Sequence, residues 1–115
     1  MANTLLNPGH EPPRLMYITC PDMDTALKIG RQMVSERRAA CANILPQMVS
    51  VYEWKGEIHE DPEVVLLLKT NLHQVEELIL RVRELHPYEL PAIFTLEIAE
   101  GLPEYLHWIA QSVNP

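Results

Sequence analysis

The hydrophobic and polar positions of residues 39–70 are arranged as in one long β-hairpin. On the first arm the residues alternate with the period of two that is typical of a pleated strand. One set is Val49, Val51 and Glu53, and the other is Ser50, Tyr52 and Trp54. Lys55-Gly56 supplies the reversal, because glycine adopts the positive φ that tight hairpin turns need. The return arm has five consecutive apolar residues at 64–68, typical of a strand covered on both faces. Each arm reaches about a dozen residues, against the usual ~5–6. A small domain cannot cover so long a ribbon, so the hairpin predicts oligomerisation.

Shorter patterns predict the remaining elements. Residues 15–20 form a strand closed by Pro21, and Asp22 is the expected N-cap of a helix that ends near 37–38. Asn71 is the second expected N-cap, and Pro87 ends the helix that follows. Residues 93–98 form a further strand, and a last helix follows residues 101–103. The order βαββαβ plus a C-terminal helix predicts an α+β, ferredoxin-like sandwich. We expect one domain over residues 15–115, preceded by a disordered tail over residues 1–14.

Composition then narrows the class of partner and the compartment. The 115 residues carry a net charge of −7, which disfavours nucleic acid and anionic membrane as partners. The first 14 residues have neither the basic nor the apolar region of an export signal, and no apolar run approaches the ~20 residues of a membrane helix. The two cysteines, Cys20 and Cys41, are too few for a disulfide framework. A reduced, cytoplasmic protein is therefore expected.

Several segments together resemble the CutA family, the divalent-cation-tolerance proteins. They are residues 38–46 (RAACANILP), residues 50–58 (SVYEWKGEI), Glu63 ahead of Leu68-Lys69-Thr70, and residues 86–93 (HPYELPAI). The resemblance runs from about Met16 to Ile109. It implies a ferredoxin-like fold in a tight homotrimer, whose long hairpins pair between subunits as in PII-like proteins. This agrees with the oligomer that the hairpin length predicts independently.

The resemblance also bears on metal binding. Some bacterial members of the family look like copper binders that use a Cys on the first strand and two consecutive His before the Pro-Tyr motif. Here these positions are Ile18, Leu85 and His86, and a carboxylate often found after the second proline is replaced by Ala92. A single imidazole does not make a copper site, because affinity comes from several converging ligands.

His86 and Cys41 are the candidate metal ligands, for copper or another divalent cation, and no cofactor is certain. Each also has a structural interpretation. His86 suits a helix C-terminus, where it bonds free backbone carbonyls, and Cys41 suits a small buried apolar position.

The resemblance places an inter-subunit cleft around the His-Pro-Tyr motif, and the candidate residues there are Tyr52, Trp54, Lys69, His86, Tyr88 and Glu89. Tyr52 and Trp54 serve either trimer packing or a ligand shelf. Lys69 needs a partner, either a carboxylate such as Glu63 or an anionic ligand. The residues His59, Glu60, Asp61 and Glu63 are of types that bind metals, but they lie on a hairpin arm interrupted by Pro62, and we expect them at a solvated edge.

No catalytic arrangement stands out, since the chain has neither a phosphate-binding glycine loop nor a G-x-S-x-G motif. Taken together with this, the resemblance to the CutA family implies a non-enzymatic homotrimer involved in the response to divalent metal ions such as copper. One alternative is a direct copper- or divalent-metal-binding protein, and a second is a PII-like sensor of a small molecule.

Overall fold

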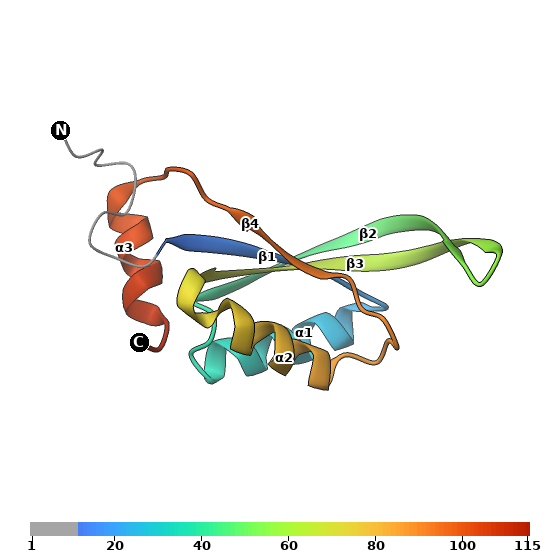
Figure 1. Cartoon of the computed structure of the whole chain (residues 1–115), viewed down its shortest axis with the longest axis horizontal. Coiled ribbons are helices and arrows are strands. Elements are labelled where there is room, and N and C mark those ends of the chain that lie inside the picture. The colour runs from blue at the N-terminus through green and yellow to red at the C-terminus, as the bar shows by residue number, and fades with distance from the viewer. Residues whose placement is uncertain (1–11) are drawn as a thin grey trace.

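The computed structural model describes residues 12–115 (Figure 1). Most of the expected N-terminal tail, residues 1–11, lies outside the described residues. Strand β1, Pro13–Cys20, begins two residues earlier than expected. It extends this far because Arg14 is paired on both sides, with Thr70 on one neighbouring strand and Glu97 on the other.

The strands form one antiparallel sheet in the order β2-β3-β1-β4, which is the predicted ferredoxin-like arrangement. The hairpin arms are β2, Cys41–Trp54, with 14 residues, and β3, Glu57–Asn71, with 15 residues, so both are slightly longer than predicted. Strand β4, Ile93–Glu97, completes the sheet beside β1. The outer half of the hairpin extends beyond the rest of the molecule (Figure 1), and the longest dimension is 53 Å against 27 and 22 Å.

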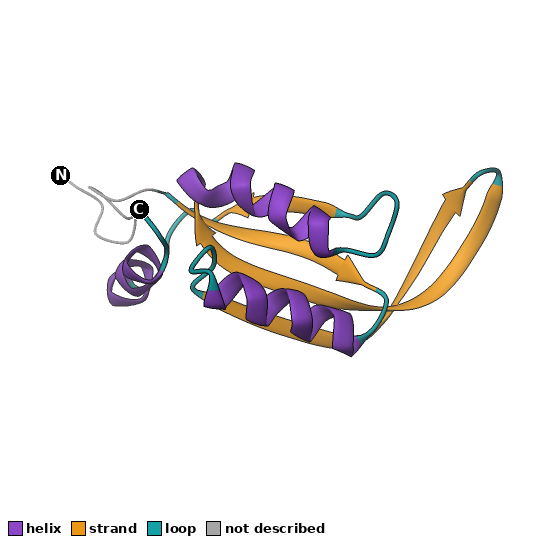
Figure 2. Cartoon of the chain, turned by 90° about the horizontal axis from the view of Figure 1, so that it is seen from below, coloured by secondary structure: helices purple, strands orange, loops and turns teal. Residues whose placement is uncertain are grey.

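The hairpin turn has the backbone conformation that its sequence predicts. Lys55 and Gly56 have φ values of 52° and 85°, and positive φ at both central positions is the mark of the turn that matches the twist of the strands. Closer to the body of the sheet, the register of β2 and β3 shifts between Leu45 and Met48, with Gln47 at a φ of 64°. Such an irregularity bends a ribbon, and the outer hairpin does curve away from the sheet (Figure 2).

Helices α1, Met23–Ser35, and α2, Val75–Leu85, cover one face of the sheet (Figure 2). Asp22 caps α1 as predicted, because its Oδ1 accepts a 2.8 Å bond from the amide of Thr25. The prediction that Asn71 caps the second helix is wrong, since its side chain makes no capping bond and a 3₁₀ turn, Leu72–Gln74, precedes α2. None of the helices among the described residues is long and apolar enough to cross a membrane.

The main core lies between the sheet and the helices α1 and α2. It is built from alternate residues of the strands and one face of each helix, including Met16, Ile18, Cys20, Leu66, Leu68, Ile29, Met33, Leu78 and Val82. A second, smaller cluster holds α3, Pro103–Ser112, at the end of the sheet opposite the hairpin tip (Figure 1). Because the central strands bury one set of residues against the helices, the intervening set faces the other side of the sheet.

Candidate functional site

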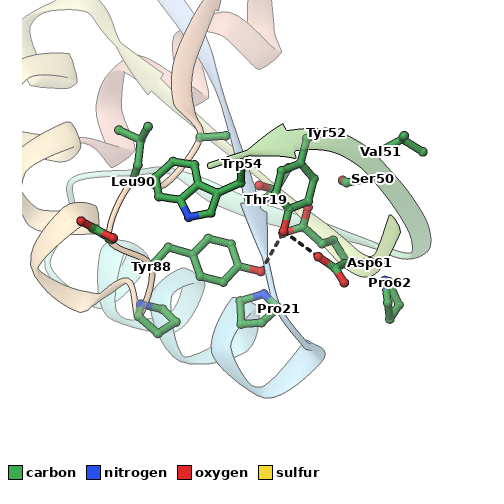
Figure 3. A pocket seen from close by; sticks show the side chains of 14 residues that line it. Thr19, Pro21, Ser50, Val51, Tyr52, Trp54, Asp61, Pro62, Tyr88 and Leu90 are labelled. Carbon is green, nitrogen blue, oxygen red and sulfur yellow. Dashed lines mark hydrogen bonds between the residues drawn. The ribbon is translucent and has the colours of Figure 1, made fainter. Parts of the chain in front are cut away.

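A pocket of 880 Å³ lies where the outer hairpin leaves the body of the molecule. Four segments form its walls: the end of β1, the outer part of β2, the facing part of β3, and the loop between α2 and β4 (Figure 3). The pocket therefore exists because a long hairpin passes beside the loop that starts at Pro87. Proline prevents α2 from continuing at this point and turns the chain toward the hairpin.

Two phenol groups donate hydrogen bonds to two carboxylates of this pocket, and both bonds are drawn in Figure 3. The hydroxyl of Tyr52 donates to Oδ2 of Asp61 at 2.6 Å, and that of Tyr88 donates to Oε2 of Glu63 at 2.7 Å. The first pair follows from register: Tyr52 is opposite His59, so Asp61 lies two residues further along the same face. The second pair joins the loop after α2 to β3.

Glu63 is the buried carboxylate of the pocket, with 7% of its surface exposed. Strand β1 ends with Cys20 opposite Val64, so Glu63 lies just beyond the last pair of that ladder. Burial is the main cause of the raised pKa values of Tyr88 and Cys20, and the charge of Glu63 raises both further. The pKa of Cys20 rises to about 12. The hydrogen bond to Asp61 is the main cause of the raised pKa of Tyr52, and Glu63 again contributes. The negative charge of Glu63 thus contributes to the raised pKa values of one thiol and two phenols around it.

His86 lies next to the pocket and uses both ring nitrogens within the fold. Its Nδ1 accepts a 3.2 Å bond from the amide of Tyr88, and its Nε2 lies 2.7 Å from the carbonyl oxygen of Thr19. Because a carbonyl accepts and an amide donates, these contacts define a neutral imidazole with its proton on Nε2. His86 is 7% exposed, and the centre of its ring lies 4.8 Å from the centre of the Tyr88 ring. In this arrangement His86 fixes the position of Tyr88.

Four of the six predicted cleft residues line the pocket, namely Tyr52, Trp54, Tyr88 and Glu89. Lys69 lies elsewhere. Its ammonium group donates a 2.9 Å bond to the hydroxyl of Tyr105 on α3 and lies 5.1 Å from the centre of that ring. Its partner is therefore a phenol in place of the expected carboxylate or anion. Cys41 is the cross-strand neighbour of Lys69, and its thiol points to Oδ1 of Asn43 at 3.8 Å.

The expectation of a solvated edge at residues 60–63 fails for Glu63, which is buried, and Asp61 and Glu63 both belong to the pocket. The signal in the sequence was a carboxylate directly before the apolar run of β3. Periodicity alone could not show that the loop after α2 folds over this position.

The described residues of a single chain do not fit a metal centre. Among residues 12–115 no group of three or more His, Cys, Asp or Glu is arranged to hold a metal ion. Both nitrogens of His86 are engaged, and Cys41 lies beside Lys69, away from the pocket. Ile18 and Leu85 stand where some family members have copper ligands, and both belong to the core between the sheet and the helices.

The class of protein is thus a ferredoxin-like, PII-like domain with an extended hairpin and a pocket at its base. The family model of the CutA1 divalent ion tolerance protein matches residues 14–112, and the chain belongs to this family.

Individual relatives agree. The chain is 46% identical over 100 residues to the divalent-cation tolerance protein CutA of Thermus thermophilus, covering 87% of this chain and 97% of the relative. It is 45% identical over 95 residues to Protein CutA of Mus musculus, covering 83% of this chain but only 54% of the mouse protein, so it spans about half the length of that relative. The crystal structure of CutA from Xylella fastidiosa superimposes with a TM-score of 0.87 at 44% identity, covering 90% of this chain and 99% of that one.

Proposed function

We propose that this protein acts as a non-enzymatic homotrimer in the tolerance of divalent metal ions such as copper, through a pocket at the base of its hairpin. The match of the CutA1 family over residues 14–112 carries this proposal. Relatives that the chain covers almost completely are named for divalent-cation tolerance. The pocket of 880 Å³ at the base of the hairpin offers a place for the ligand that such a role needs.

Two exposed apolar surfaces support the trimer. On the outer hairpin Val49, Val51 and Ile58 are 65%, 66% and 70% exposed, although residues of this kind are normally covered. The sheet face opposite α1 and α2 carries a second patch, in which the rings of Tyr17 and Phe94 stack at 4.9 Å and about half of Phe94 is exposed. Further copies of the chain are the occupants that a long hairpin and an open sheet face favour, since strands pair through their edges.

A second candidate function is the sensing of a small molecule, and the volume of the pocket favours it. Organic ligands occupy sites of roughly 300–1,000 Å³, and this pocket measures 880 Å³. The two functions are compatible if the ligand reports on metal stress.

The cytoplasm is the proposed compartment, on the ground that neither cysteine is paired. Cys20 is buried in the core and Cys41 lies on β2, and both thiols are free. Compartments differ among the relatives, since a plant homologue is named as chloroplastic and an archaeal homologue as periplasmic.

Complementation tests the tolerance function. A bacterial strain that lacks its own CutA-family gene should regain growth in elevated Cu²⁺ when it expresses this chain. The strain should be challenged with Zn²⁺ and Co²⁺ in parallel, because the family name specifies divalent cations in general. Growth that stays at the level of the empty vector with all three ions, despite normal amounts of folded protein, contradicts the proposal.

A further inference from the structure

The charges that line the pocket define the kind of ligand that it can hold. Its lining contains three carboxylates, those of Asp61, Glu63 and Glu89, and includes no Lys, Arg or His among the described residues. An anionic ligand would meet repulsion from every charged group in this lining. A cationic ligand would meet attraction from the same groups, and the overall charge of −7 has the same sign.

Glu63 is the carboxylate best placed to hold a cation. It is 7% exposed, and a buried carboxylate is costly unless it is paired and hydrogen-bonded. The phenol of Tyr88 donates one hydrogen bond to it, whereas an ionised carboxylate accepts up to about four. No Lys or Arg forms an ion pair with Glu63 among the described residues. A positively charged ligand would therefore satisfy a buried charge that the chain leaves without a cation.

The rest of the lining is aromatic and apolar. Tyr52 and Trp54 come from β2 and Tyr88 comes from the loop after α2, and Figure 3 shows the three rings facing the same space. Ring faces attract ammonium groups that lie within about 6 Å. The ammonium group of Lys55 lies 5.7 Å from the centre of the Trp54 ring, so this ring already contacts a cation of the chain.

Volume and geometry distinguish an organic cation from a metal ion. Metal ions need several oxygen ligands converging at about 2.0–2.6 Å, and no cluster of three ligand side chains occurs within residues 12–115. A volume of 880 Å³ with Trp54, Leu90 and prolines in its walls suits a ligand with an apolar body.

We propose that this pocket binds a small organic ammonium ion, with its charged group at Glu63 and its apolar body against Trp54 and Tyr88. The inference rests on the proposed function because it names the ligand class of the same pocket. A ligand of this class is neither a metal ion nor an anion.

The test is a series of three small probes of similar shape and different charge. Phenethylamine is a cation at pH 7, 2-phenylethanol is neutral and phenylacetate is an anion. Calorimetric titration of the full chain should show that phenethylamine binds at least about ten-fold more tightly than either of the other two, as expected for one charge-assisted contact. Equal binding of all three probes, tighter binding of the anion, or no binding of the amine would overturn the inference.

Two matched variants locate the charge. Glu63→Gln keeps the size of the side chain and an oxygen for Tyr88, and it should weaken phenethylamine about ten-fold while leaving 2-phenylethanol unchanged. Glu60→Gln removes the same charge from an exposed residue of β3 outside the lining and should have no effect. An equal loss in both variants would mean that the general field of the molecule attracts the amine, and it would overturn the site.

The binding experiments and the complementation experiment can fail independently of each other. Rescue of metal tolerance by a protein that binds no amine would refute only the ligand class. Charge-selective binding by a protein that fails to rescue growth would refute only the metal-tolerance role.

Discussion

The hydroxyl of Tyr88 donates a 2.7 Å hydrogen bond to Oε2 of Glu63, which connects the loop after α2 with the strand at the base of the hairpin. His86 orients this contact, because its Nδ1 accepts the amide proton of Tyr88 while its Nε2–H bonds the end of β1. Three segments that are distant in the sequence thus meet at one buried carboxylate. The loop that forms a wall of the pocket is held in place by these contacts.

Removal of the Tyr88 hydroxyl should destabilise the protein. In Tyr88→Phe the buried carboxylate of Glu63 loses its donor, and an unsatisfied buried acceptor costs roughly 1–3 kcal/mol. Urea unfolding at a fixed protein concentration measures the loss. Tyr52→Phe is the matched control, because its hydroxyl binds Asp61 at the exposed surface and its loss should matter less. Equal effects of the two variants would show that burial of Glu63 does not set the cost.

The acid limb of the stability curve should depend on Glu36. Hydrogen bonds from Arg81, Gln32 and Arg38 lower the pKa of Glu36 from its ordinary value of 4.5 to about 2. A carboxylate whose pKa is lower in the folded state stabilises that state above pH 4.5, and the contribution disappears as pH falls toward 2.

Glu36→Gln should therefore be less stable than wild type at pH 6, and the difference in the free energy of unfolding should shrink between pH 4.5 and pH 2. Urea titrations at several pH values in this range measure it, with Glu60→Gln as a control that should follow the wild-type curve. If the difference in the free energy of unfolding stays constant with pH, the substitution acts through packing. The charge of Glu36 would then not contribute to stability.

Cys20 should resist alkylation in the native protein. Burial, together with the charges of Glu63 and Asp22, raises the pKa of its thiol to about 12, and only the thiolate is nucleophilic. Iodoacetamide at pH 8 followed by peptide mass spectrometry should find Cys20 unmodified in native protein and modified once the protein is unfolded in urea. Labelling of native Cys20 at the rate seen in urea would show that β1 opens readily beside the pocket.

The sequence predicted the elements whose signals are local. Period-two alternation and Lys55-Gly56 specified the hairpin, and Asp22 was recognised as an N-cap because its partner amide, that of Thr25, is close in the sequence. Asn71 has the same residue type as many N-caps, but tertiary packing buries it, its Oδ1 finds no partner, and the helix starts later.

The pocket was predictable only in part, for the same reason. Tyr52 and Trp54 were candidates because large aromatic residues on an extended arm need a partner surface, and Tyr88 was a candidate through the resemblance of its His-Pro-Tyr motif to the CutA family; all three line the pocket. Glu63 looked like a solvated residue of the hairpin, since its burial depends on a loop that comes much later in the sequence and packs against β3. Lys69 likewise paired with Tyr105 on α3, a contact that no local pattern encodes.

The outer hairpin gives the most direct test of the oligomer. Ile58 is 70% exposed in a single chain, so Ile58→Asp should leave the fold of the monomer intact. If neighbouring subunits cover Ile58, the substitution buries a charge and removes an apolar contact worth roughly 1.5–3 kcal/mol in each of three copies. Light scattering should give three times 13.2 kDa for wild type and a smaller, concentration-dependent mass for the variant.

Leu80→Asp is the matched control for this experiment, because Leu80 is 59% exposed on α2, which is not part of the hairpin. It should retain the wild-type mass at both low and high micromolar concentration. A wild-type mass of a single chain would refute the trimer outright. If Ile58→Asp remains a trimer, the subunits make their contacts through the open sheet face around Tyr17 and Phe94 and not through the outer hairpin. Light scattering of Phe94→Asp then tests that face.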